Sequence, residues 1–310
     1  MINLETSFST RDAMYQSFNA RAVGLANLPV ETTIKVAAGA GFDAVDLMIR
    51  DLVRSGTDLP RLRDQMGELG LRGGAFPMTM DWRGDEASFR RDLAELPKLA
   101  KAASFLGLTR TGTWVMPETP TMPPPGADPA KFRAEVTAFH VDRIGAIARV
   151  LADHGIKLGL EVIGVSKFRR GTGVPFITRM SDLVPTLEAI WDQPNVGLLG
   201  DVFHLYAAGE PITQALGWGV DRVVWVHVAD LPRGAAIDRK AIIDAERGLP
   251  GKDGTIDCRA FLRMLQEAGY DGPVTAEPLA RCESLVGHEP DDVARRVKSA
   301  MDECWPGASR

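Results

Sequence analysis

Short apolar runs alternate along the chain with longer segments in which apolar residues recur at the spacing of an amphipathic helix. The runs short enough to be strands cover residues 14–20, 42–49, 71–78, 107–116, 156–163, 195–202, 220–230 and 271–279. Most of them are continuously apolar rather than alternating, which is typical of parallel strands buried on both faces. Each run is followed by enough residues for a helix, so the pattern predicts eight β/α units.

Glycine stands just before several of these runs, where the preceding helix would end. Gly70, Gly107 and Gly269 are examples, and glycine is the favoured residue just past a helix C-terminus. Eight β/α units in 310 residues predict an α/β fold, a (β/α)8 TIM barrel in a single domain over residues 1–310, with the barrel at about 14–300. An open, doubly wound sheet is less favoured because no predicted strand leads into a GxGxxG turn.

Two segments depart from this alternation, and each follows a predicted strand. Residues 116–129 contain too many prolines for a regular helix or strand, and residues 231–257 form a long irregular stretch. The loops that follow the strands of a TIM barrel surround its active site. The proline-rich segment is therefore either a variable surface loop or a cover over the pocket, and the second segment is a further candidate for such a cover.

The composition is that of an ordinary globular protein, with 45% apolar residues, 25% charged residues and a net charge of −5. The acidic excess and the scattered basic residues argue against a nucleic-acid partner. The three cysteines form no CxxC pair, so neither a disulfide framework nor a thiolate zinc site is expected. The first residues contain no long apolar run, so we expect no secretory signal, no membrane partner and a cytoplasmic location.

Four consecutive predicted strands, from the fifth to the eighth, carry an ionisable side chain near the end: Glu161, Asp201, His227 and Glu277. The C-terminal ends of barrel strands meet at one face, so these groups are expected to converge. Buried carboxylates would repel one another, and a divalent cation would remove that penalty. Three carboxylates and one imidazole favour one Mn²⁺ ion, with Mg²⁺ or Co²⁺ as alternatives. Taken singly, each residue also fits a helix cap, a salt-bridge partner or a core histidine.

Five segments at or near these strand ends are GLEVIGVSKFR, NVGLLGDVFHLYAAGE, VVWVHVAD, LPGKDGTID and GYDGPVTAEPL. In order and spacing they resemble the xylose isomerase-like TIM barrel family, the sugar phosphate isomerase/epimerase superfamily. The resemblance covers roughly residues 14–300 and is strongest after residue 155. The endonuclease branch of this family is not favoured, because it needs more histidine ligands than the chain has at its predicted strand ends.

The resemblance implies that Glu161, Asp201, His227 and Glu277 bind one divalent metal. It further implies that Glu161 and Glu277 are the catalytic pair that removes a proton from the substrate and returns it. The metal would stabilise the enediolate formed between these two steps. The expected protein is a metal-dependent sugar isomerase or epimerase that acts on a keto-sugar or related polyol derivative.

Further residues are candidates for substrate binding. The resemblance implies such contacts for His204, three residues after the sixth-strand aspartate, and for Arg233, six residues after the seventh-strand histidine. Lys167 follows the fifth strand and would bind a phosphate or carboxylate, or else belongs to a solvated basic cluster. Trp114, near the end of the fourth strand, would stack on a sugar ring or else pack in the core.

The reaction stays open at this point. The segment GVSKFRRG lacks the acidic residue that ketose 3-epimerases place there, which argues against a free-ketose 3-epimerase. The same enediolate chemistry supports a metal-dependent lyase, decarboxylase or dehydratase of an oxo-sugar, including C-glycoside cleavage. A non-catalytic metal- or sugar-binding barrel is the third alternative. The expected partner is a small-molecule sugar or sugar derivative; a homo-oligomer is compatible with the resemblance, and no sequence feature decides the oligomeric state.

Overall fold

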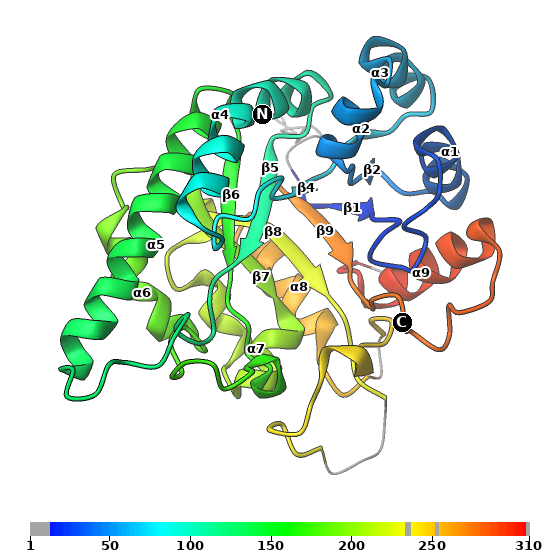
Figure 1. Cartoon of the computed structure of the whole chain (residues 1–310). Coiled ribbons are helices and arrows are strands. Elements are labelled where there is room, and N and C mark those ends of the chain that lie inside the picture. Colours follow the sequence, from blue (N-terminus) through cyan, green and yellow to red (C-terminus); the bar gives the residue numbers. More distant parts are fainter. Residues whose placement is uncertain (1–12, 233–236, 252–253, 308–310) are drawn as a thin grey trace, which may run out of the picture.

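The computed structural model describes residues 13–232, 237–251 and 254–307. The strands in these ranges are β1 (Tyr15–Phe18), β2 (Ala44–Val45), β3 (Arg72–Gly73), β4 (Phe76–Pro77), β5 (Arg110–Trp114), β6 (Lys157–Glu161), β7 (Val196–Asp201), β8 (Val223–Val228) and β9 (Pro273–Ala276). They form one parallel sheet in the order β3-β2-β1-β9-β8-β7-β6-β5-β4. The sheet curls around a central axis, with the helices on its outside (Figure 1).

The α-helices are α1 (Val30–Ala40), α2 (Ile49–Ser55), α3 (Leu59–Glu68), α4 (Glu86–Phe105), α5 (Pro129–Ala152), α6 (Met180–Ala189), α7 (Val202–Ala208), α8 (Cys258–Glu267) and α9 (Pro290–Cys304). Short 3-10 helices are η1 (Ser166–Phe168), η2 (Ile212–Leu216), η3 (Val220–Arg222) and η4 (Asp244–Glu246). None of the helices in the described part of the chain is both long and apolar enough to cross a membrane.

The third predicted strand, residues 71–78, closes the barrel. The structure divides it into β3, which pairs with β2, and β4, which pairs with β5. Gly74 lies at the division, where an added Cβ would collide with the side chains of Ser17 and Asp46. A residue without a side chain is therefore required at this close approach. Each of the eight predicted runs contains at least one strand, and the predicted (β/α)8 barrel is confirmed.

The glycines that were predicted to end helices do so with left-handed backbone angles. Gly70, Gly107 and Gly269 follow α3, α4 and α8 with φ of 72°, 75° and 88°. Residues with a Cβ rarely adopt these angles, so glycine lets each helix stop and turn back toward the next strand.

The interior of the barrel is filled by large side chains. Every residue of β7 and β8 is buried, as expected for strands covered on both faces. Leu199 and Trp225, from these two strands, form a cluster with Ala75. Trp225 Nε1 donates a hydrogen bond to Thr275 Oγ1 at 2.9 Å, which satisfies the buried indole. This packed layer forms a floor beneath the C-terminal ends of the strands.

Candidate metal centre

The four predicted ligands converge at the C-terminal ends of neighbouring strands. Glu161 and Asp201 are the last residues of β6 and β7, His227 is the second-last residue of β8, and Glu277 directly follows β9. One donor atom from each residue lies within 4.8 Å of the donor atoms of the others. We call this group of four side chains the candidate metal centre. Adjacent parallel strands place their ends side by side, which explains how residues up to 116 positions apart in sequence meet.

The candidate metal centre is almost closed to solvent. Glu161, Asp201 and His227 are 9%, 3% and 5% exposed. Burial raises the pKa of Glu161 well above its ordinary range, and the neighbouring charges of Glu277 and Asp201 raise it further. Burial acts on the other two carboxyl groups in the same direction, but nearby cations outweigh it and lower the pKa values of Asp201 and Glu277. The nearby cations therefore favour the ionised forms of Asp201 and Glu277, whereas ionisation of Glu161 would need further positive charge in the site.

His227 gives a test of whether these residues fit a metal ion. Burial lowers the pKa of His227, but the carboxylates of Glu277, Glu161 and Asp201 outweigh burial and raise it to about 9. Neither ring nitrogen makes a well-aligned hydrogen bond among the described residues, although Nδ1 lies within reach of Glu277, 3.4 Å from its Oε2. Buried imidazoles are normally hydrogen-bonded, and an unpartnered nitrogen facing carboxylates is suited to a metal. The donor set thus fits a divalent cation.

Arg247 is a residue of this site that the sequence analysis did not identify. It follows η4, in the segment after β8 that extends beyond the strand ends in Figure 1. Its Nη1 lies 2.7 Å from Asp201 Oδ2 and 3.2 Å from Glu277 Oε2. Nε lies 3.2 Å from Asp244 Oδ1. An internal cation therefore compensates part of the negative charge of the candidate metal centre.

The position of Arg247 also bears on the expected role of residues 231–257. The segment was a candidate for a cover over the site, and within its described residues 237–251 a buried arginine bound to Asp201 supports this interpretation. The sequence signal was weak, because Arg247 is one of three arginines in a segment that follows a barrel strand. The spacing of that arginine does not show which carboxylates it meets.

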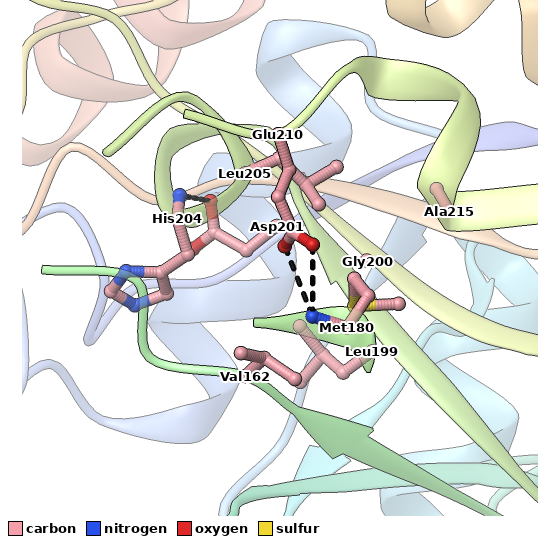
Figure 2. A pocket seen from close by; sticks show the side chains of 9 residues that line it. All are labelled: Val162, Met180, Leu199, Gly200, Asp201, His204, Leu205, Glu210 and Ala215. Carbon is pink, nitrogen blue, oxygen red and sulfur yellow. Dashed lines mark hydrogen bonds between the residues drawn. The ribbon is translucent and has the colours of Figure 1, made fainter. Parts of the chain in front are cut away.

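His204, which was predicted to contact substrate, lies on α7, three residues after Asp201. Asp201 caps this helix, because its Oδ1 accepts a hydrogen bond from the Phe203 backbone N–H at 2.8 Å. His204 Nε2 lies 2.9 Å from Arg247 Nη2 and 3.9 Å from Glu161 Oε1. Burial lowers the pKa of His204, which favours the neutral imidazole. Figure 2 shows Asp201 and His204 beside Glu210, whose carboxylate accepts a hydrogen bond from the Met180 backbone N–H.

A cavity of about 370 Å³ opens beside the candidate metal centre and has Glu161, His227 and Glu277 in its wall. Trp114, a predicted substrate contact, also lines it. Lys167 is exposed on η1 and, within the described residues, is not part of this lining. The predicted substrate contact Arg233 lies outside the described residues.

The proline-rich segment 116–129 contacts the loop that follows β6. Glu118 accepts hydrogen bonds from the backbone N–H groups of Arg170 and Gly171 at 3.1 and 2.9 Å. The segment is thereby fastened to the loop that follows β6. Within the described residues, none of residues 116–129 lines the cavity, which favours the interpretation as a surface loop over that as a lid.

Comparison with known proteins finds similarity to one barrel family. A sequence model of the xylose isomerase-like TIM barrel family matches residues 34–304. A putative hydroxypyruvate isomerase from Mus musculus is 28% identical over 228 residues, which are 74% of this chain and 70% of the relative. An inosose isomerase from Halalkalibacterium halodurans is 26% identical over 47% of this chain and 48% of its own length. An inosose dehydratase from Lacticaseibacillus casei is 26% identical over 44% and 46%, respectively.

Solved structures share the fold along nearly the whole chain. A xylose isomerase domain protein from Alicyclobacillus acidocaldarius superposes with a TM-score of 0.78 and 27% identity, covering 94% of this chain and 98% of that chain. The IOLI protein, solved with a bound zinc atom, superposes with a TM-score of 0.75 and 18% identity, covering 96% and 99%. At 18% identity, the similarity to the IOLI protein concerns the fold alone.

Proposed function

Because the chain belongs to the xylose isomerase-like TIM barrel family, we propose that it is a divalent-metal-dependent sugar isomerase or epimerase acting on a keto-sugar or related polyol derivative. Its curated relatives include isomerases, which supports an enzyme of this type. The observation that carries the proposal is the convergence of four donor atoms within 4.8 Å at the C-terminal end of the barrel. This is the end at which TIM barrels carry their active sites.

All four residues of the candidate metal centre would hold the ion. Oxygen donors outnumber the single nitrogen donor, so we assign Mn²⁺, with Mg²⁺ or Co²⁺ as alternatives. When bound, a divalent cation polarises a substrate carbonyl and stabilises the negative charge of an enediolate, an effect worth several kcal/mol. Zinc, which is bound in the IOLI protein, is the competing metal in the experiment below.

Glu161 and Glu277 are the proposed acid–base pair. They come from the two outer strands of the four that build the candidate metal centre, so they approach a bound substrate from different sides. Burial and like charge raise the pKa of Glu161, whereas His227 and Arg247 outweigh burial and lower that of Glu277. Two carboxyl groups with separated pKa values suit one acid and one base.

In this proposal one glutamate removes a proton from a substrate carbon and the other returns a proton. Return to the opposite face of the same carbon is epimerisation, and return to the neighbouring carbon is isomerisation. His204, 3.9 Å from Glu161 Oε1, would hold a substrate oxygen next to that carboxyl group. Trp114 would cover the substrate in the cavity that it lines with Glu161.

A lyase is the second candidate function. It is favoured by the match to an inosose dehydratase. Loss of water from an oxo-sugar begins with the same proton removal, so the same glutamates would serve. Loss of carbon dioxide breaks a C–C bond and leaves an enolate, which would need only the protonated glutamate to return a proton. Products distinguish the two functions, because a lyase changes the composition of its substrate and an isomerase does not.

The variants Glu161→Gln and Glu277→Gln test the proposed function. Each is expected to weaken Mn²⁺ binding by about tenfold or more and to lower turnover by about 10²–10⁴-fold, because a ligand and a proton carrier are lost together. Metal content is measured by mass spectrometry after dialysis against limiting Mn²⁺ or Zn²⁺. Turnover is measured by NMR as solvent deuterium incorporated into ketoses, ketose phosphates and 3-oxo-sugars.

Glu210→Gln is the matched control. Glu210 is a partly buried carboxylate next to Asp201 in Figure 2, but it binds the backbone of Met180 and is no member of the candidate metal centre. This variant is expected to keep wild-type metal content and turnover. If Glu161→Gln and Glu277→Gln also keep both, the proposed function is wrong.

A further inference from the structure

Arg83 is a partly buried cation in the wall of the cavity beside the candidate metal centre. It lies between β4 and α4, and its side chain is 17% exposed. Its Nη1 donates to Thr113 Oγ1 at 3.1 Å and to the Trp114 backbone carbonyl at 2.9 Å. The guanidinium carbon lies 3.7 Å from the centre of the Trp114 ring. Neutral groups therefore hold Arg83 in place.

The position of Arg83 relative to the candidate metal centre follows from the strand register. Trp114 of β5 is the register partner of Glu161 of β6. Neighbouring strands are about 4.8 Å apart, so the ring that Arg83 covers stands one strand away from Glu161. Both residues line the same cavity as Arg83. A small ligand in that cavity can therefore meet the guanidinium and the candidate metal centre at once.

The charge of Arg83 is poorly compensated within the protein. Among the described residues, the carboxylate within ion-pair distance is that of Asp81, with Nε and Oδ1 3.3 Å apart. The Asp81 side chain is 68% exposed, so solvent screens this pair. Burial lowers the pKa of Arg83 because the charged form is penalised. A second cation, the exposed Arg21, lines the same cavity and adds positive charge.

The backbone segment that carries Arg83 is held in place by hydrogen bonds from other elements. Arg143 of α5 donates two hydrogen bonds of 2.6 Å, to the backbone carbonyls of Trp82 and Gly84 on either side of Arg83. The Trp82 side chain is fully buried, and its Nε1 donates to Thr113 Oγ1 at 3.1 Å. The guanidinium is therefore held in position before any ligand arrives, which reduces the entropy lost on binding.

We propose that Arg83, assisted by Arg21, forms an anion-binding subsite in the cavity beside the candidate metal centre, and that the substrate carries a carboxylate group. This inference rests on the proposed function and narrows its substrate to an acidic hydroxy-carbonyl compound. A guanidinium presents a planar fork of N–H donors that matches a carboxylate. The carbonyl and hydroxyl of the same ligand are then directed to the candidate metal centre.

Hydroxypyruvate and dihydroxyacetone are a matched pair of probes. Both are three-carbon hydroxyketones, and they differ by a carboxylate in place of a hydroxymethyl group. Wild-type protein is expected to bind hydroxypyruvate about tenfold more tightly or better, because a charge-assisted hydrogen bond contributes at least that much. Dissociation constants are measured by ligand-observed NMR, with Mn²⁺ and after its removal.

Arg83→Met and Arg83→Gln should each abolish most of this preference and leave dihydroxyacetone binding within about twofold of wild type, since only the ionic contact is lost. The glutamine variant keeps a donor for the Trp114 carbonyl, so it still tests the proposal if the methionine variant fails to fold. Arg222→Met is the matched control. Arg222 also covers a tryptophan, Trp191, at 4.0 Å and binds backbone carbonyls, but it precedes β8 at the opposite end of the barrel.

Equal affinity of the wild type for the two probes would overturn the proposal, as would a preference that survives in both Arg83 variants. Dihydroxyacetone phosphate is a third probe, and it tests whether the bound anion is a phosphate. If it binds more tightly than hydroxypyruvate and depends on Arg83, the carboxylate assignment is wrong and the anion is a phosphate. Failure of the proposed function has a different signature: wild-type protein would bind no metal, while the anion preference in the metal-free samples would remain measurable.

Discussion

Arg247 is a buried cation and Arg83 a partly buried cation next to the same site, and their surroundings differ. The side chain of Arg247 is 2% exposed, and its Nη1 contacts the carboxylates of Asp201 and Glu277. The side chain of Arg83 is 17% exposed and is held by a hydroxyl, a carbonyl and an aromatic ring. One arginine thus has its counter-charges inside the protein, and the other has mainly neutral contacts.

This difference separates two roles of a positive charge beside the site. The guanidinium of Arg247 reduces the repulsion among carboxylates that the barrel brings together, so its contribution is to the stability of the protein without a ligand. The guanidinium of Arg83 is fixed in a cavity wall and paired with a solvent-screened carboxylate, so its contribution is expected on ligand binding. Stability and binding measurements on matched variants therefore test whether the two arginines have these separate roles.

The largest expected effect is that of Arg247→Met in metal-free protein. Removal of this cation leaves Asp201 and Glu277 buried without their partner, which is expected to lower the free energy of unfolding by about 3–5 kcal/mol. Arg83→Met should lower it by about 1 kcal/mol, because neutral hydrogen bonds are lost and no charge is stranded. Urea denaturation in the presence of a chelator measures both values.

The same urea denaturation with added Mn²⁺ gives a second comparison of the two variants. A bound divalent cation supplies positive charge to the same carboxylates, so the deficit of Arg247→Met should become smaller when Mn²⁺ is present. The deficit of Arg83→Met should not change with Mn²⁺. An equal loss of stability in the two variants without metal would contradict the distinction between the two arginines.

The second effect depends on pH and concerns the support of Arg83. His140 of α5 is fully buried against Trp82, with ring centres 5.0 Å apart. Burial, together with the charge of Arg83, lowers the pKa of His140 from 6.5 to about 4. The unfolded chain therefore takes up a proton at a higher pH than the folded protein does. The stability contributed by the neutral imidazole is present above pH 6.5 and is lost as pH falls toward about 4.

The difference between these pKa values of His140 corresponds to about 3 kcal/mol, at roughly 1.4 kcal/mol per pKa unit. The variant His140→Phe keeps an aromatic ring against Trp82 but cannot be protonated. Its free energy of unfolding should consequently fall less than that of wild type between pH 6.5 and 4. Urea denaturation across this range gives the difference, which cancels the carboxyl groups common to both proteins. Parallel pH profiles would show that His140 is not the titrating group.

The fold and the candidate metal centre were largely predictable from sequence, for related reasons. Strand runs are apolar on both faces, so Glu161 and Asp201 stand out as charged residues that close such runs. The order of parallel strands then brings these positions to one end of the barrel. The periodicity could not show that residues 71–78 form two short strands, because that division depends on the approach of Gly74 to Ser17 and Asp46.

The two arginines were not predictable, because both lie on loops. A loop has no periodicity that relates the position of a residue to the direction of its side chain. Lys167 was preferred as an anion-binding candidate because it follows a predicted strand closely, yet the structure places it on the surface and Arg83 in the cavity wall. Tertiary contacts, such as those of Arg143 to the backbone around Arg83, decide which basic residue faces the site.

The smallest expected effect is that of Asp81→Asn, and it tests the claim that Arg83 lacks an effective internal partner. The amide side chain of this variant would keep an oxygen to accept the hydrogen bond from the Arg83 backbone N–H, which is 3.1 Å long in the wild type. Because the Asp81 side chain is 68% exposed, loss of its charge should change the free energy of unfolding by about 0.5 kcal/mol or less.

Hydroxypyruvate binding to Asp81→Asn should stay within about twofold of wild type or become slightly tighter, because a screened anion near Arg83 has been removed. Urea denaturation and the NMR titration used for Arg83→Met supply the two numbers. A loss of roughly 2 kcal/mol or more would mean that Asp81 already neutralises Arg83 in the folded protein, since only a well-desolvated pair contributes that much. In that case the two arginines would be alike, and the charge of Arg83 would not be available to a carboxylate ligand.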